Sequence, residues 1–156
     1  MDLRGCEGLT NELFGLISVH VTELTTLKLG GHDKSYNTVF SKKGLKWLDR
    51  CFLPLKTIQL DFCAKIGTSA LEIIANNFSE TLEELTIKRN CLESCAKISD
   101  ESMVALSPCI NLKRLSIIYT RKFGENAINI IAASFPKLEV LNLRECLIQS
   151  DFSVLG

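Results

Sequence analysis

The feature that most constrains the fold of this 156-residue chain is a nine-residue pattern that recurs five times. Its copies start 26 to 31 residues apart, at Leu24, Leu55, Leu82, Leu112 and Leu138. They read LTTLKLGGH, LKTIQLDFC, LEELTIKRN, LKRLSIIYT and LEVLNLREC, each with apolar residues at the first, fourth and sixth places. A fixed period of this length indicates stacked repeats, because one repeat cannot bury its apolar face alone.

The spacing within each copy predicts a short strand, since residues two apart along a strand point to the same side. We expect the fourth and sixth places to face the core: Leu27 and Leu29, Ile58 and Leu60, Leu85 and Ile87, Leu115 and Ile117, Leu141 and Leu143. The ninth place is Cys63, Cys146, Asn90, Thr120 or His32, on a bend whose backbone groups need partners. The segment DLRGC, ending at Cys6, carries the tail of the same pattern.

A second apolar set lies between the copies and predicts a strand end followed by a helix. Its members are Phe40, Leu45, Leu48, Ile66, Leu71, Ile74, Ile98, Met103, Leu106, Phe123, Ile128 and Ile131. GTSALEIIANNF and ENAINIIAASF are the clearest helical segments. A proline follows three of the expected helices and precedes the next strand, where a helix must stop: Pro54, Pro108 and Pro136.

The pattern resembles the leucine-rich repeat, whose signature is L-x-x-L-x-L-x-x-N/C-x-L. The repeat length favours its ribonuclease-inhibitor-like or cysteine-containing subtype, which has room for a true helix. The resemblance implies an α/β fold, a leucine-rich-repeat solenoid shaped as an arc, with a concave parallel sheet and convex helices. We expect one domain over residues 1–156, with about five repeats and partial repeats at the ends.

Neither end of the sequence carries a dedicated polar cap, which a repeat array needs on its terminal repeats. We therefore expect a fragment of a longer repeat protein. The alternative is a short protein that pairs its ends with a partner. An uncovered last strand would also favour self-association through the uncapped ends.

The composition excludes several classes of protein. Lys and Arg number 18, as do Asp and Glu, so the generic basic footprint of nucleic-acid binding is absent. No apolar run is long enough to span a membrane, and the N-terminus has no export signal. We read the seven cysteines as reduced thiols of a cytoplasmic or nuclear protein.

The sequence offers no convincing catalytic, cofactor or metal site. Cys91 and Cys95 could hold half a zinc site, but no second pair completes it. His20 and His32 are better read as structural or surface residues than as partners of a catalytic thiolate. The glycines of LGGHDKS lack the spacing of a phosphate loop. We therefore expect no enzyme, no cofactor and no metal, with a cysteine-based enzyme as a minor alternative.

The outward places of the strands are the best candidates for a binding site, because matching places lie side by side in a parallel sheet. The eighth place runs Gly31, Phe62, Arg89, Tyr119 and Glu145, and could form a cation–π trio of Phe62, Arg89 and Tyr119. With the third, fifth and seventh places added, we expect these residues to bind a protein or peptide: Lys28, Gln59, Asp61, Phe62, Lys88, Arg89, Arg114, Tyr119 and Arg144. The alternative is that Phe62 and Tyr119 merely cover the rim of the core.

LDFCAKIGTSAL and KISDESMVAL are similar to the cysteine-containing repeats of F-box proteins. That resemblance implies a non-catalytic arc that recruits substrates to a ubiquitin ligase. No F-box segment precedes the repeats in this sequence, so the implication requires a longer parent. The rival hypothesis is a scaffold or regulator unrelated to ubiquitin, either inhibitor-like or GTPase-regulating.

Overall fold

The computed structural model describes residues 1–6, 10, 12–31, 37–41, 45, 46, 48, 52–88, 98–120, 123–146, 148 and 149. Its helices are α1 (Leu13–His20), α3 (Thr68–Phe78), α4 (Asp100–Leu106) and α5 (Glu125–Ser134). Its strands are β1 (Thr26–Gly30), β2 (Asn37–Ser41), β3 (Thr57–Asp61), β4 (Cys63–Lys65), β5 (Glu84–Lys88), β6 (Arg114–Ile118), β7 (Phe123–Gly124), β8 (Val140–Asn142) and β9 (Ile148–Gln149). The chain therefore has an α/β fold, with strands and helices close to the predicted positions.

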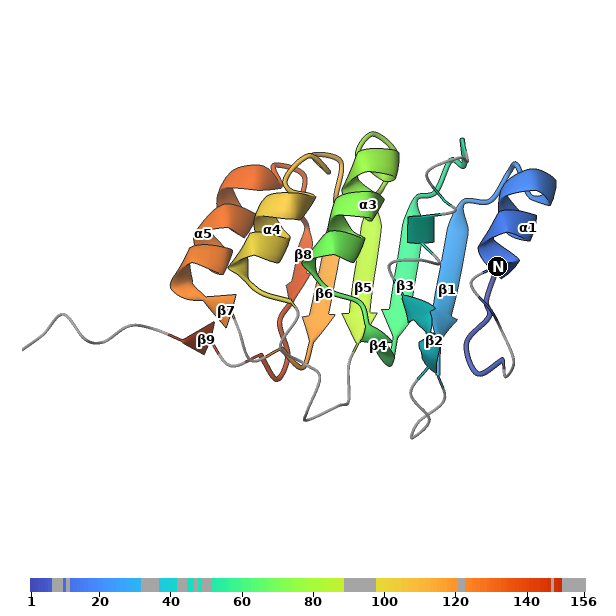
Figure 1. Cartoon of the computed structure of the whole chain (residues 1–156). Helices are drawn as coiled ribbons and strands as arrows, with labels where there is room; N and C mark the ends of the chain where they lie inside the picture. The colour runs from blue at the N-terminus through green and yellow to red at the C-terminus, as the bar shows by residue number, and fades with distance from the viewer. Residues whose placement is uncertain are drawn as a thin grey trace, which may run out of the picture.

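The main sheet is parallel and has the order β1-β3-β5-β6-β8, so each of its strands lies beside the next one along the chain. The register places the fourth residues of successive copies opposite one another: Leu27, Ile58, Leu85, Leu115 and Leu141. Helices α3, α4 and α5 lie on one face of this sheet (Figure 1). Two small parallel sheets, β2-β4 and β7-β9, lie near the carboxyl ends of the main strands (Figure 1).

The same backbone hydrogen bonds join successive copies. Where one strand begins, the second-place carbonyl accepts the N–H groups of the second and third places of the next copy. The carbonyl of Thr25 accepts from Lys56 and Thr57 at 2.8 and 3.0 Å, and the arrangement recurs through Glu139 and Val140. Beyond the strand, the eighth-place N–H donates to the next copy's seventh-place carbonyl, in Gly5→Gly30, Gly31→Asp61, Phe62→Lys88 and Tyr119→Arg144.

Residues 1–6 extend the main sheet beside β1, as the match of DLRGC to the tail of the pattern suggests. Lys28 N–H donates to the Met1 carbonyl at 3.0 Å, and Leu3 N–H donates to the Lys28 carbonyl at 2.8 Å. The amino terminus of Met1 donates to the Thr26 carbonyl at 2.6 Å. The segment thus occupies the place of a strand one copy before β1.

The inward places behave as predicted in the first four copies, where the fourth and sixth residues are 0 or 1% exposed. The expectation of a buried side chain is wrong at Leu141, which is 42% exposed, and Leu143 is only partly buried. Strand β8 has one neighbour, β6, in the main sheet. Its inward side chains therefore lack the cover that neighbours on both sides give the central strands.

The second apolar set forms the layer between sheet and helices. Leu45, Leu48, Ile66, Leu71, Ile74, Ile98, Met103, Leu106, Phe123 and Ile131 of this set are buried, and Ile128 is half-buried. Polar side chains form hydrogen bonds at the first turns of the helices. The Thr68 and Ser102 hydroxyls are 2.7 Å apart, and Ser102 Oγ accepts from Ser99 N–H at 3.0 Å. Asp100 Oδ1 accepts from Gly124 N–H at 2.7 Å, which ties α4 to the start of α5.

Candidate protein-binding face

The face of the main sheet opposite α3, α4 and α5 carries the side chains of the third, fifth and seventh places, and we call it the open face (Figure 1). Most of these side chains are half-buried or exposed, whereas the fourth and sixth places between them are buried in β1, β3, β5 and β6. Parallel register aligns matching places into rows across the strands. The fifth-place row runs Lys28, Gln59, Thr86, Ser116 and Asn142.

The eighth place is a left-handed turn that follows the strand. Gly5, Phe62, Tyr119 and Glu145 have φ of 73°, 54°, 66° and 58°. Residues other than glycine are uncommon in this conformation, so its recurrence at one place marks a requirement of the repeat. The eighth place therefore lies outside the strand. Its side chains do not continue the outward-facing column in which we expected them.

Phe62 is the clearest correction to the predicted site. The left-handed turn leaves its side chain 6% exposed, so a partner cannot contact most of it. Its ring instead lies under Lys88, whose Nζ is 5.4 Å from the ring centroid. This is a cation–π contact. The predicted trio includes Arg89, which lies outside the described residues, so the trio stays a prediction. Tyr119 is half-buried and hydrogen-bonded to Glu145, which raises the pKa of its phenol.

The ninth place serves the bend, as predicted. Cys63 Sγ lies 3.5 Å from the Asp61 carbonyl, Cys146 Sγ 3.1 Å from the Ile117 carbonyl, and Thr120 Oγ1 2.9 Å from the Ile98 carbonyl. These side chains donate to backbone oxygens at or near the bend, and the Asp61 carbonyl also accepts from Gly31 N–H. Cys6, by contrast, is exposed.

Nothing in the described part of the chain gathers three or more potential metal ligands. Burial raises the pKa of the Cys109 thiol to about 11 and also raises that of Cys146, so both stay protonated near neutral pH. Cys91, Cys95 and His32 lie outside the described residues, and His20 is exposed at the end of α1. Of the described helices, none has the length and apolar character needed to cross a membrane.

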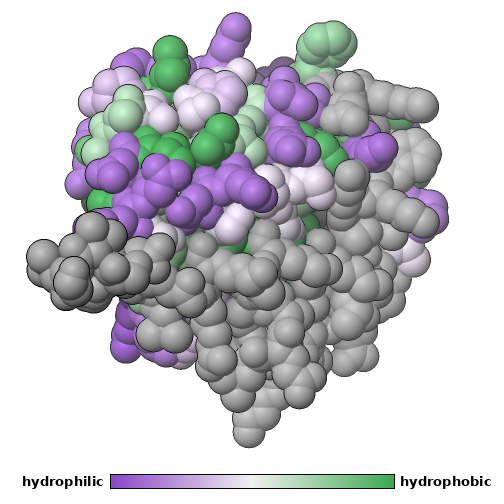
Figure 2. Space-filling view, turned by 60° about the vertical axis from the view of Figure 1, so that its left-hand side comes forward, coloured by the Kyte–Doolittle hydropathy of each residue, from purple (hydrophilic) through white to green (hydrophobic). Residues whose placement is uncertain are grey.

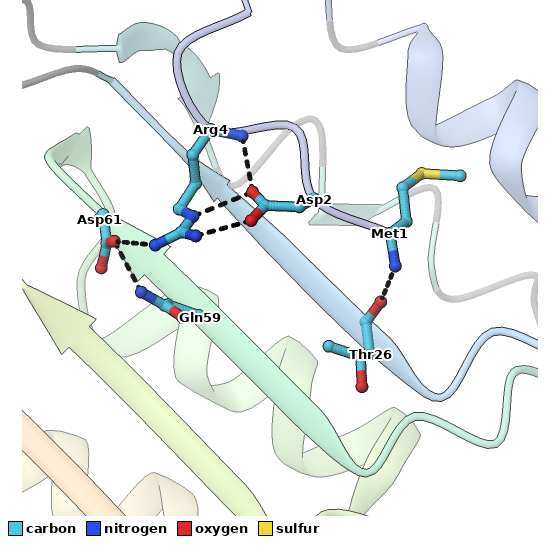
Figure 3. Close-up of polar contacts among 6 residues, drawn as sticks. All are labelled: Met1, Asp2, Arg4, Thr26, Gln59 and Asp61. Carbon is cyan, nitrogen blue, oxygen red and sulfur yellow. Dashed lines mark hydrogen bonds and ion pairs between the residues drawn. The ribbon is translucent and has the colours of Figure 1, made fainter.

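The N-terminal half of the open face, formed by residues 1–6, β1 and β3, is occupied by an ion-pair network (Figure 3). Arg4 donates to both carboxylate oxygens of Asp2, at 2.9 and 2.6 Å, and to Asp61 Oδ2 at 3.4 Å. Gln59 Nε2 donates to the same Asp61 oxygen at 2.7 Å. The hydrogen bonds of Arg4 hold the pKa of the Asp2 carboxyl well below its usual range.

Asp61 is a second correction, because it is buried with 6% exposure rather than displayed to a partner. Gly30 explains how Arg4 reaches it. Gly30 holds the seventh place between them, and its φ of 155° suits glycine. A Cβ on Gly30 would collide with the Asp61 carbonyl oxygen. The absent side chain leaves Arg4 a path across β1.

The C-terminal half of the open face, formed by β5, β6, β8 and the two residues Arg144 and Glu145, has looser ion pairs. Arg114 Nε lies 3.4 Å from Glu84 Oε1, and Arg144 Nε lies 3.5 Å from Glu145 Oε1. The side chains of Arg114 and Arg144 are 56% and 76% exposed. Among the described residues, no carboxylate lies within ion-pair distance of Lys88. This half therefore displays two largely exposed arginines and Lys88, whereas the described N-terminal half has the ion-paired Arg4 and the half-buried Lys28.

A row of oppositely charged side chains, which we call the charge ladder, runs along the edge where the strands begin. It is formed at the second place of the copies by Lys56, Glu83 and Lys113. Lys113 Nζ lies 2.7 Å from Glu83 Oε2, and Lys56 Nζ lies 3.3 Å from Glu83 Oε1. The hydrogen bonds to Lys113 and Lys56 lower the pKa of the Glu83 carboxyl. These alternating charges neutralise one another and join neighbouring copies.

The crystal structure of the Rad7 and Elc1 complex in yeast contains a chain with a similar fold, at a TM-score of 0.73 and 22% sequence identity. The match covers 94% of this chain and 36% of that one. This chain thus spans about a third of the length of its solved neighbour. A scan against protein-family models and a search of curated proteins gave no match.

Proposed function

We propose that this chain is a non-catalytic, protein-binding leucine-rich-repeat domain whose arc presents the open face as its concave surface. The observation that carries the proposal is that helices cover one face of the main sheet, while the opposite face displays aligned rows of polar side chains (Figure 1). The similarity to a chain of the Rad7 and Elc1 complex supports the α/β fold on which the proposal is built. The described cysteines Cys6, Cys109 and Cys146 are free thiols, which suits the cytoplasm or nucleus.

Within that function, we propose substrate recognition for an F-box type ubiquitin ligase, on the strength of the segments LDFCAKIGTSAL and KISDESMVAL. The solved neighbour is itself described in complex with a second protein, which agrees with a protein-interaction role. The second candidate is a scaffold or regulator unrelated to ubiquitin. An F-box in the parent gene product would favour the first candidate, and another domain there would favour the second.

Capture of partners from cell extract tests the binding function without assuming anything about the partner's charge. Ser116 lies between Thr86 and Asn142 in the fifth-place row on the open face, so Ser116→Arg places a bulky side chain beneath a partner bound there. Ser134→Arg makes the same change at the end of α5, on the helical side. We expect wild type and Ser134→Arg to capture the same proteins by mass spectrometry and Ser116→Arg to lose them. Equal capture by both folded variants would refute binding on the open face.

A further inference from the structure

The C-terminal half of the open face has the chemistry to recognise a partner's acidic segment. We propose that this segment lies across β5, β6 and β8, and that its carboxylates bind Lys88, Arg114 and Arg144. The inference rests on the proposed protein-binding function and adds the class of partner and the half of the face that it occupies.

The cationic groups of this half are available because their internal partners hold them weakly. The Arg114–Glu84 and Arg144–Glu145 pairs have contacts of 3.4 and 3.5 Å, with both arginines more than half exposed. Ion pairs this exposed contribute only about 0–1 kcal/mol each. A partner carboxylate with bidentate geometry can therefore compete with Glu84 or Glu145 at little cost.

Lys88 is the third cationic group. It is half-buried at the seventh place of β5, beside Ile118 of β6. Its ammonium lies over the Phe62 ring rather than against a described carboxylate. The buried ring thus orients the Lys88 side chain, and the ammonium keeps hydrogen-bonding capacity for an incoming anion.

The fifth-place row gives a bound segment a neutral path between these charges. Thr86, Ser116 and Asn142 lie opposite one another in register, so we call them the polar row. Arg114 lies on one side of this row, at the third place, and Lys88 and Arg144 lie on the other, at the seventh. Adjacent strands are about 4.8 Å apart, so about three extended residues cross from β5 to β8. Carboxylates on successive residues would point to opposite sides of the row, where the cationic groups lie.

Apolar side chains between the charges give the segment a second type of contact. Ile118 is half-buried on β6, and Val140, directly beside Arg114 in the register, is 40% exposed. At the adjoining α5 end of the molecule, which Figure 2 turns forward, the described hydrophobic and hydrophilic residues lie intermixed. A purely apolar partner would bury the arginines without compensation, which is costly. An acidic segment with an aliphatic or aromatic residue meets both requirements.

The described N-terminal half offers a bound carboxylate fewer cations: Lys28 is half-buried, and Arg4 is already paired. Asp2 and Asp61 satisfy Arg4, and Gln59 is hydrogen-bonded to Asp61. A nucleic-acid backbone is also a weaker fit for the C-terminal half. Glu84 and Glu145 stand between its cations, and phosphate binding depends on many unopposed positive charges.

Selection from a phage-displayed library of random dodecapeptides tests the inference on the whole chain. We expect the selected peptides to be enriched in Asp and Glu around an apolar residue. Fluorescence anisotropy with the best peptide should then show that Arg114→Glu and Arg144→Glu each weaken binding by about tenfold or more, and that added salt weakens it further. Lys137→Glu is the matched charge reversal, on an exposed lysine in the turn before β8, and should change affinity less than about twofold.

Several outcomes overturn the inference. These are failure to select any peptide, selected peptides without an acidic excess, equal effects of Arg144→Glu and Lys137→Glu, and tighter binding of a labelled DNA duplex than of the best peptide. They are distinguishable from failure of the proposed function. If neutral or basic peptides are selected and Ser116→Arg abolishes their binding, the open face is a binding surface of a different chemistry. If Ser116→Arg changes neither peptide binding nor partner capture, both proposals fall.

Discussion

Arg4 and Arg144 hold the same place in the repeat at opposite ends of the open face, yet their surroundings differ. Arg4 donates twice to Asp2 and reaches Asp61, whereas Arg144 has one ion-pair contact at 3.5 Å and is 76% exposed. The cause lies in the neighbouring strands. Gly30 opens a path from Arg4 to a buried carboxylate, whereas the seventh place one copy before Arg144 is Ile118, which carries no charge. Whether a charged side chain on the open face is held by internal ion pairs or can bind a partner thus depends on the residues of the neighbouring strands.

The comparison extends from charge to packing. The N-terminal half is bordered by residues 1–6 and has fully buried inward leucines. The C-terminal half ends at β8, where Val140 and Leu141 are about equally exposed, at 40% and 42%. The four changes below test this difference, from the largest expected effect to the smallest.

Leu27 and Leu141 should differ most, because they hold the fourth place at opposite ends of the main sheet. Leu27→Ala removes a fully buried side chain and should lower the free energy of unfolding by about 2–5 kcal/mol. Leu141→Ala should cost about 1 kcal/mol or less, since the side chain is already 42% exposed. Urea unfolding followed by circular dichroism measures both. Equal costs would mean that the two ends are packed alike.

Gly30→Ala should destabilise the N-terminal half by about 1–3 kcal/mol, through backbone strain and the collision with the Asp61 carbonyl. Gly124→Ala is the control, because the nearest atom to its added Cβ would be a carboxylate oxygen of Asp100, at 2.8 Å, on a side chain that can turn. Thermal unfolding compares the two. A Gly30→Ala protein as stable as wild type would show that the space over Gly30 is not required.

Arg4→Met should cost about 1 kcal/mol, because it leaves the buried Asp61 carboxylate with Gln59 as its remaining side-chain donor among the described residues. Arg144→Met, the same change at the same place, should alter stability by no more than about 0.5 kcal/mol. Chemical unfolding of both variants gives the comparison directly. If Arg144→Met proved the more damaging, the assignment of structural and available arginines would be reversed.

Glu83 pairs with a lysine on each side, Lys56 before β3 and Lys113 before β6. The stabilisation from these two ion pairs therefore belongs to both halves of the sheet, and we expect it to vary with pH. The lowered pKa of Glu83 means that its stabilisation is complete above about pH 4.3 and is lost as the pH falls through the folded-state value. The raised pKa of Lys113 means that its share is present below about pH 10.4 and lost as the pH rises through the folded-state value.

The difference in melting temperature between wild type and Glu83→Gln should therefore be largest near neutral pH and shrink towards both extremes. Glu101→Gln, on the exposed side of α4, controls for a general charge effect. A difference in melting temperature that does not vary with pH would contradict a stabilising role of the charge ladder.

Much of the fold could be predicted from apolar spacing alone, because burial of the fourth and sixth places requires only a period of two within a strand. Leu60 and Leu115 illustrate this, and both are buried. The exposure of Leu141 could not be read from the same spacing, because it depends on what lies beyond β8.

The candidate site was harder to predict because the eighth place leaves the strand in a left-handed turn. A signal existed: the eighth place is glycine at Gly5 and Gly31, and glycine favours positive φ. The burial of Asp61 had no such local signal. It requires Arg4, Gly30 and Asp61 to align across three strands, and that register is a property of the folded sheet.

The recurring hydrogen bonds between second-, third-, seventh- and eighth-place backbone groups also bear on how such a chain can change over evolutionary time. The hydrogen bonds that join one copy to the next are formed by backbone N–H and carbonyl groups. Every residue has both groups, except proline, which has no N–H. Duplication or deletion of a whole copy therefore keeps the same hydrogen bonds. Residues can also be gained or lost between the nine-residue patterns, whose starts are 26 to 31 residues apart, but not within a strand without shifting its register. The number of copies can therefore change while the side chains on the open face vary, because those side chains take no part in the backbone bonds between copies.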